Sequence, residues 1–130
     1  MVKLSVLFFL NKISSEFYLK LLSEIFKILQ KNLHARFFVF LKSLFKLLLF
    51  IPKKIRILRQ HQTLILVRGL KFRANGRLRG KPRSNSCVFS IGQHPIQTLK
   101  SAIFFTKTHV YTRYGVFGFR LWTYRVGCFV

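Results

Sequence analysis

The spacing of apolar residues changes at Pro52, and this change most constrains the fold of the chain. Before Pro52, the polar residues Lys20, Glu24, Lys27 and Lys31 recur every three or four positions, which is the period of a helix. After it, a basic linker runs to Gln62, and from Leu70 to Ala74 apolar and charged residues alternate one by one, which is the period of a strand. The sequence therefore predicts helices first and strands afterwards, in an α+β fold.

Two helices are predicted in the first half. One begins near Ser14 and Glu16 and runs over residues 16–31, and the other spans residues 36–51. Pro52 ends the second helix, because the residue before a proline avoids the α region. Four apolar residues follow one another down one face of the first helix: Phe17, Leu21, Ile25 and Ile28.

Four strands are predicted in the second half, over residues 64–74, 87–91, 103–111 and 116–125. In the first strand, Leu70, Phe72 and Ala74 alternate with Lys71 and Arg73, so one face packs and the other is positive. In the last strand, the same alternation places two sets of three residues on opposite faces. We expect Phe117, Phe119 and Leu121 to face the core, and Arg120, Trp122 and Tyr124 to face away from it.

A short helical turn from His94 to Leu99 is predicted between the second and third strands, with Pro95 at its first helical position. The element order α-β-β-α-β-β predicts a two-layer helix/sheet domain. We place this domain at residues 63–130. A basic amphipathic helical extension and linker is expected to precede it, over residues 1–62.

The charge of the chain requires a polyanionic partner. Lys and Arg number 24 against two acidic residues, which gives a formal net charge of +22 on 130 residues. A chain with 51% hydrophobic residues is not a disordered basic tail. Nucleic acid and an anionic membrane surface are the two candidates, and a core combined with a large positive field is typical of proteins embedded in structured RNA. The excess of Phe, Leu, Ile and Lys hints at an AT-rich organelle genome.

Residues 35–51 are strongly apolar, but Lys42 and Lys46 interrupt them on one helix face. A membrane-spanning helix needs about 20 mostly uncharged residues, so an integral membrane protein is not expected. An amphipathic helix with a narrow polar stripe fits better. A basic amphipathic protein that lies on a membrane surface remains the alternative hypothesis.

Catalytic and metal-binding patterns are missing from the sequence. The chain has no Asp and only two Glu, so paired-carboxylate catalysis is unavailable. Cys87 and Cys128 have no CxxC partner, and the four His residues show no ligand spacing. We therefore expect no enzyme, no metal and no cofactor.

Residues 75–85, NGRLRGKPRSN, form a basic turn rich in Gly and Asn. The turn is either a solvated hairpin loop or a loop that grips phosphate. Glycine lets a backbone approach a ligand, and arginine supplies forked donors for phosphate. Four basic residues and no acid favour the phosphate-binding interpretation.

Three ordered segments resemble the C-terminal part of the bacterial and organellar ribosomal small-subunit protein three family. TRYGVFGFRLW, residues 112–122, resembles the signature at the end of that family, with Thr112, Tyr114, Gly115, Val116, Gly118 and Trp122 in place. GLKFRANGRLRG, residues 69–80, and HPIQTLKSAIFF, residues 94–105, resemble two upstream segments in the right order. The resemblance covers about residues 64–126.

The resemblance implies a structural constituent of the small ribosomal subunit. Its expected partners are rRNA in the head of the subunit and neighbouring head proteins, near the mRNA entry side. We expect it in the mitochondrial matrix, encoded in the organelle genome. Ala102, Phe104 and His109 stand where the family usually carries acids, which makes this surface more basic or more apolar.

The family has a KH domain ahead of this region, and residues 1–60 do not resemble one. We expect either that a separate chain supplies the KH part or that other proteins replace it. Arg36 aligns with the first Arg of the family element implicated in mRNA entry, whereas Phe37 and Phe40 replace two of its basic residues. Arg36 is therefore the one mRNA-entry candidate.

The candidate rRNA-binding residues come from the basic linker, the first strand, the loops and the last strand. Trp122 is a candidate for contact or for ordinary packing at the sheet, since Trp serves both roles. The full set is Lys53, Lys54, Arg56, Lys71, Arg73, Arg77, Arg79, Lys81, Arg83, Lys100, Arg113, Arg120 and Trp122.

Overall fold

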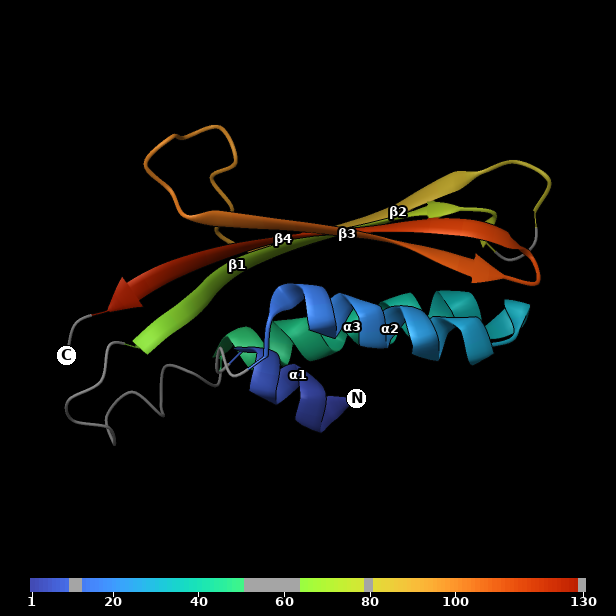
Figure 1. The fold of residues 1–130 in the computed structure, drawn as a ribbon, viewed down its shortest axis with the longest axis horizontal. Coiled ribbons are helices and arrows are strands. Elements are labelled where there is room, and N and C mark those ends of the chain that lie inside the picture. The colour runs from blue at the N-terminus through green and yellow to red at the C-terminus, as the bar shows by residue number, and fades with distance from the viewer. Residues whose placement is uncertain (10–12, 51–63, 79–80, 129–130) are drawn as a thin grey trace.

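The computed structural model describes residues 1–9, 13–50, 64–78 and 81–128, and confirms the two-layer α+β fold. Helices α2 and α3 lie on one face of a four-stranded sheet, α1 packs against them on the same side, and the described residues place no helix on the other face (Figure 1). The helical elements are α1 (Val2–Phe9), α2 (Ser15–Ile28), the 3₁₀ turn η1 (Lys31–Leu33) and α3 (His34–Phe50). The strands are β1 (Leu64–Gly76), β2 (Asn85–Gly92), β3 (Ile103–Thr112) and β4 (Gly115–Cys128).

The sheet is antiparallel, with the strand order β2-β1-β4-β3. The two long strands, β1 and β4, lie in the centre, and β2 and β3 form the edges. The predicted parity of β4 is confirmed, because Phe117, Phe119 and Leu121 are fully buried beneath the helices. Arg120 is exposed on the opposite face.

Helix α3 buries one stripe against the sheet at helical spacing. Its buried residues are His34, Phe37, Phe38, Leu41, Leu44, Phe45 and Leu48. Lys42 and Lys46 are both exposed, as their shared face predicts. The helix begins at His34, two residues before the predicted start.

Helix α2 buries a different face from the predicted one. Phe17 and Ile28, both expected on its apolar face, are 52% and 85% exposed. The buried face consists of Tyr18, Leu19, Leu22, Ser23 and Phe26. Apolar residues surround much of this helix, so the periodicity alone does not decide which of two adjacent stripes meets the sheet.

An aromatic cluster forms the centre of the core. The Phe26 ring lies with its centroid 4.4–5.6 Å from those of His34, Phe37, Phe38, Phe117 and Phe119. These residues come from α2, α3 and β4. The helices and the sheet therefore share one continuous core.

The apolar residues near the N-terminus form α1, which packs on the same core. Phe8 is fully buried and stacks on Tyr18 with ring centroids 4.5 Å apart. The Ser5 and Tyr18 hydroxyls form a buried hydrogen bond of 2.8 Å. That pair satisfies two hydroxyls in an otherwise apolar contact.

The predicted helical turn from His94 to Leu99 is wrong, because this segment forms turns without a helix. The Thr98 and Ser101 hydroxyls both donate to the Pro95 carbonyl, at 3.1 and 2.8 Å. Such local side-chain bonds offer the backbone an alternative to helical pairing. The predicted domain boundary between residues 62 and 63 falls in residues 51–63, outside the described residues, and stays a prediction.

Candidate nucleic-acid interface

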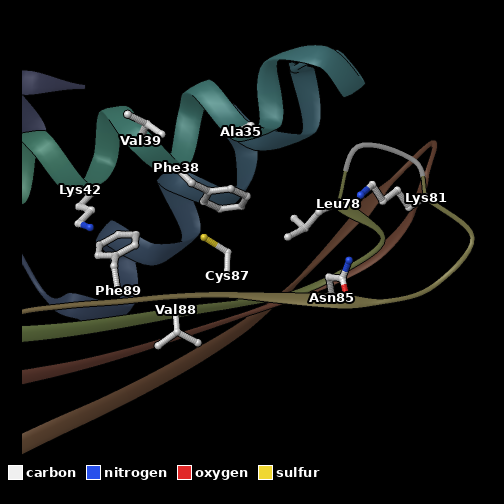
Figure 2. A pocket seen from close by; sticks show the side chains of 10 residues that line it. All are labelled: Ala35, Phe38, Val39, Lys42, Leu78, Lys81, Asn85, Cys87, Val88 and Phe89. Atoms are coloured by element: carbon white, nitrogen blue, oxygen red, sulfur yellow. The ribbon is translucent and has the colours of Figure 1, made fainter.

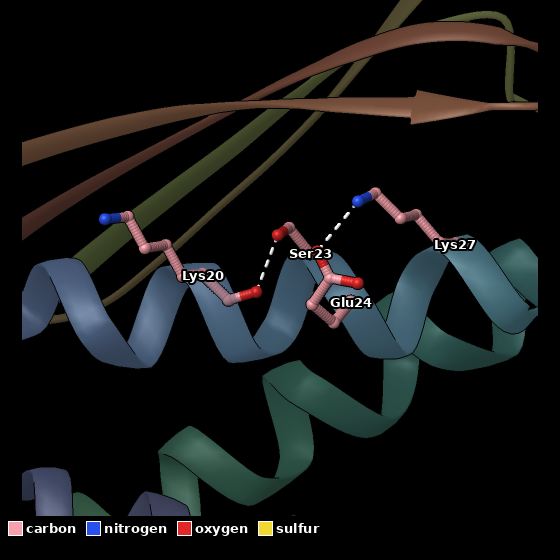
Figure 3. Close-up of polar contacts among 4 residues, drawn as sticks. All are labelled: Lys20, Ser23, Glu24 and Lys27. Atoms are coloured by element: carbon pink, nitrogen blue, oxygen red, sulfur yellow. Dashed lines mark hydrogen bonds and ion pairs between the residues drawn. The ribbon is translucent and has the colours of Figure 1, made fainter.

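The two acidic residues of the chain both lie on α2, where lysines accompany them. Glu24 receives a 2.7 Å contact from Lys27, and Glu16 lies 3.9 Å from Lys20 (the first pair is shown in Figure 3). The Ser23 hydroxyl donates to the Lys20 carbonyl between these pairs, at 2.6 Å. Residues 64–128 contain no Asp or Glu, so the sheet itself supplies no carboxylate side chain to Arg73, Lys107 or Arg120.

Cations from three strands form a row across the uncovered face of the sheet. Arg73 of β1 lies opposite Arg120 of β4, which lies opposite Lys107 of β3. Like charges directly opposite one another in a sheet are destabilising. This row is therefore a surface that an anion would stabilise.

A second row lies two residues further along each strand, on the same face. Lys71 of β1 lies opposite Trp122, and Trp122 lies opposite Phe105 of β3. The Trp122 and Phe105 ring centroids are 5.1 Å apart, and the Lys71 ammonium lies 5.6 Å from the Trp122 ring centroid. The uncovered face thus combines aromatic and cationic side chains.

A third group of cations surrounds a hollow of about 300 Å³ at one end of the sheet. The hollow is lined by Lys31, Arg77, Arg113, Tyr114 and Gly115. Three segments that are distant in the sequence supply its cations: η1, the turn after β1 and the turn between β3 and β4. Their convergence without an acidic side chain among the lining residues gives the hollow a positive charge.

Local contacts hold this end in place. The Arg77 Nε donates to the Lys81 carbonyl at 3.0 Å, and the Lys31 ammonium lies 4.9 Å from the Tyr114 ring centroid. Thr112 closes the β3–β4 turn, since its hydroxyl donates to the Gly115 carbonyl at 2.8 Å. The backbone of Gly115 has a φ of +125°, a conformation that residues other than glycine rarely adopt.

The structure brings together some of the predicted residues and leaves others apart. Lys71, Arg73, Arg120 and Trp122 share the uncovered face, and Arg77 and Arg113 share the hollow. Lys81, Arg83 and Lys100 are exposed in the connecting turns, and Arg36 is exposed in the first turn of α3. Lys53, Lys54, Arg56 and Arg79 lie outside the described residues.

Three residues at these surfaces were not predicted from the sequence: Lys31, Lys107 and Phe105. Lys31 was assigned only to a helix face, and its approach to Arg77 depends on how η1 meets the sheet. Lys107 and Phe105 have the parity of the outer face in β3. That alternation could have indicated their exposure, but only the strand register places them beside Arg120 and Trp122.

A more apolar hollow of about 400 Å³ lies between α3 and β2 (Figure 2). Its lining includes Phe38, Phe89, Lys42 and the free thiol of Cys87. Burial raises the pKa of the Cys87 thiol, and the charge of Lys42 partly opposes this shift. The lining contains no acid or histidine that could activate the thiol.

The described residues include neither a metal cluster nor a membrane-spanning helix. No group of three or more His, Cys, Asp or Glu residues in these parts of the chain is arranged to hold a metal ion. None of the helices described there is long and apolar enough to cross a membrane.

No family model matches the chain. The chain is 39% identical over 56 residues to small ribosomal subunit protein uS3c of Cyanidioschyzon merolae. This match covers 43% of this chain and 27% of the relative. The chain is 33% identical over 58 residues to uS3 of Aquifex pyrophilus (45% and 25%) and 35% identical over 63 residues to uS3 of Neorickettsia sennetsu (48% and 30%). Each match therefore spans less than a third of the relative's length.

The length of these matches agrees with the extent of the motifs found in residues 64–126. The described residues of the three motifs lie in β1 and its following turn, in the β2–β3 connection and the start of β3, and in β4 with the turn before it, all on one sheet. The chain resembles the C-terminal domain of the small ribosomal subunit protein uS3.

Proposed function

We propose that this protein is a structural constituent of the small ribosomal subunit and binds rRNA. One observation carries the proposal. Two segments that bear the uS3 resemblance, residues 69–80 and 112–122, meet at one end of the sheet, where Arg77 and Arg113 line the same hollow. A phosphate group of rRNA is the anion that would fit between these guanidinium groups, because Arg presents forked donors to phosphate oxygens.

The electrostatics of the fold support this proposal. A formal net charge of +22 favours a partner with many phosphates, and residues 64–128 contain no Asp or Glu. Neutralising phosphates releases the counterions condensed on RNA, so affinity falls as salt rises. If about 6–10 phosphates are contacted, affinity should fall by about 10³–10⁵ between 50 and 200 mM salt.

The finer assignments are part of the same proposal. The protein would act in the mitochondrial matrix, be encoded in the organelle genome, and contact rRNA and neighbouring proteins in the head. Arg36, exposed at the start of α3, is the candidate for contact with mRNA near its entry. The supply of a KH part by another chain remains a prediction.

Sedimentation of tagged protein from organelle lysates tests the proposal. The protein should sediment with the small subunit after detergent treatment, and ribonuclease or high salt should release it. Arg77→Ala with Arg113→Ala should reduce the sedimented fraction more than Lys42→Ala with Lys46→Ala, which removes the same charge from the exposed side of α3. Failure of the wild-type protein to sediment with the subunit would refute the proposed function.

A membrane-surface protein is the second candidate, and the exposed apolar residues of the helices favour it. Ile28, Val39 and Leu47 are 85%, 66% and 65% exposed. Amphipathic helices of this kind lie in the interface of anionic membranes. Under this hypothesis, detergent would release the protein from its pellet, whereas ribonuclease would not.

A further inference from the structure

We propose that the uncovered face of the sheet binds an unpaired RNA strand, with bases stacked on Trp122 and Phe105 and phosphates on Arg73, Arg120 and Lys107. The inference rests on the proposed function, because it specifies the kind of RNA bound. It concerns a different surface from the hollow at Arg77 and Arg113, so the two can be tested separately.

The aromatic part of this face is suited to stacking. Phe105 is 48% exposed, and its ring lies beside Trp122 with centroids 5.1 Å apart and an interplanar angle of 38°. Lys71 lies near the Trp122 ring from the neighbouring strand. Bases of a single strand stack on such side chains because every base has a π-face.

The cationic part lies two residues along each strand from the aromatic part. Along β4, Arg120 is two residues from Trp122, and along β3, Lys107 is two residues from Phe105. Two residues of a strand span about 6.6–6.8 Å on the same face. A strand that stacks its bases on the aromatic row therefore has the row of cations within reach of its phosphates.

Arg73 is oriented for this role by its own strand. Its Nε donates to the Asn75 side-chain oxygen at 3.0 Å, which leaves its terminal nitrogens available to a phosphate. Three cations from adjacent strands repel one another when no anion is present. A bound phosphate would relieve that repulsion.

Gly118 supplies an independent indication that something approaches this face. It lies in β4 next to the row of cations, paired with Asn75 and His109. A Cβ atom built at this position would meet nothing within 4 Å, so packing within the chain does not require glycine there. Glycine inside a strand often marks a place where a ligand comes close to the backbone.

The combination of residues favours unpaired RNA over other partners. Base stacking on side chains requires bases that are free of a duplex. An acidic peptide would pair with the cations but would leave the adjacent Trp122 and Phe105 rings without a role. The strands of this face carry no Asp or Glu that would complement a basic protein.

Trp122 is the one tryptophan of the chain, so its fluorescence reports directly on this surface. The full-length protein would be titrated, at fixed salt, with a single-stranded RNA oligonucleotide, with the same sequence as a duplex, and with poly-glutamate. We expect the single strand to quench the fluorescence and to bind at least about tenfold more tightly than the duplex, because it adds stacking to the phosphate contacts. Equal affinity for single strand and duplex, or equal quenching by poly-glutamate, would overturn the inference.

Substitutions separate the parts of the surface. Trp122→Ala and Phe105→Ala should each weaken RNA binding about 5- to 150-fold per lost stacked base. Fluorescence anisotropy of labelled RNA measures the change in affinity. Gly118→Val should weaken binding while thermal unfolding changes little, since its side chain would occupy the space left for the strand. Lys42→Ala with Lys46→Ala should change affinity far less. Unchanged binding by Trp122→Ala and Phe105→Ala would also overturn the inference.

The two proposals fail in different ways. If the wild-type protein sediments with the small subunit but Trp122→Ala and Phe105→Ala bind single strands normally, the proposed function stands and the sheet-face inference falls. If the wild-type protein does not sediment with the small subunit, the proposed function falls first, whatever the oligonucleotides show.

Discussion

Phe26 stacks on His34 in the core, with ring centroids 4.4 Å apart and an interplanar angle of 27°. His34 is fully buried, and its ring is close to perpendicular to the rings of Phe117 and Tyr114, with centroids 5.5 and 5.9 Å away. Neither ring nitrogen makes a hydrogen bond of standard geometry with a described residue. Burial lowers the pKa of His34, and a backbone contact with Leu29 partly opposes the shift.

The stability of the fold should therefore decrease in mild acid. The unfolded chain binds a proton at His34 near the ordinary pKa of about 6.5, whereas the folded chain resists it to lower pH. Stability is fully present above that value and is lost as pH falls toward the folded pKa, by about 1.4 kcal/mol for each unit of difference. Urea unfolding at pH 5 and pH 7.5 measures the loss. His34→Phe should flatten the dependence, and an unchanged slope in that variant would assign it to other groups.

Phe26→Ala should destabilise the protein by about 3–5 kcal/mol, because it removes the ring at the centre of the aromatic cluster. Phe17 offers a matched control on the same helix, since it is exposed. Phe17→Ala should change the free energy of unfolding by less than about 0.5 kcal/mol. Chemical denaturation of both variants checks the prediction. Similar losses in the two would mean that α2 packs through its other face.

Gly69→Ala should be strongly destabilising, by more than about 2 kcal/mol. An added Cβ would lie far inside contact distance of the Gln93 carbonyl oxygen, and this is backbone that cannot rotate away. Gly118→Ala should be neutral or slightly stabilising, because nothing lies near the new atom and glycine weakens a strand by about 0.5–1 kcal/mol. Thermal unfolding compares the two. A large loss in Gly118→Ala would contradict the open space above β4.

Ser5→Ala should destabilise the docking of α1 by about 1–3 kcal/mol, because it leaves the buried Tyr18 hydroxyl without its 2.8 Å partner. Tyr18→Phe added to Ser5→Ala should recover part of this loss, since it removes the unsatisfied group. Unfolding free energies of the single and double variants form a cycle that measures the pair. If the double variant is no more stable than Ser5→Ala, the hydroxyl contact contributes little.

The sequence was sufficient for features that depend on local spacing. The change of period around Pro52 predicted the two layers, and the parity of Phe117, Phe119 and Leu121 predicted the inner face of β4. It was insufficient where several local solutions have similar energy. Phe17 and Ile28 lie on a helix with apolar residues on more than one side, so only the packed sheet selects the buried stripe.

The candidate site was predictable in its residue types but not in its groupings. Arg77 and Arg113 could be chosen from their turns, yet their shared hollow with Lys31 depends on the meeting of three distant segments. The row formed by Arg120 and Lys107 likewise depends on strand register, which alternation alone does not fix. Tertiary structure, rather than local preference, decides both.

The central position of β1 and β4 has a consequence for the order of folding. Leu64 pairs with Cys128 and Asn75 with Gly118, so the middle of the sheet closes a long loop of chain that includes both edge strands. Contacts so distant in sequence form late, because the entropic cost of closing the loop must be met before the contacts stabilise the fold. During synthesis, the helices and β1 emerge from the ribosome well before β4 does. Their apolar faces cannot pack against β4 until then. We therefore expect the final closure of the core to follow the emergence of the strand that carries Arg120 and Trp122.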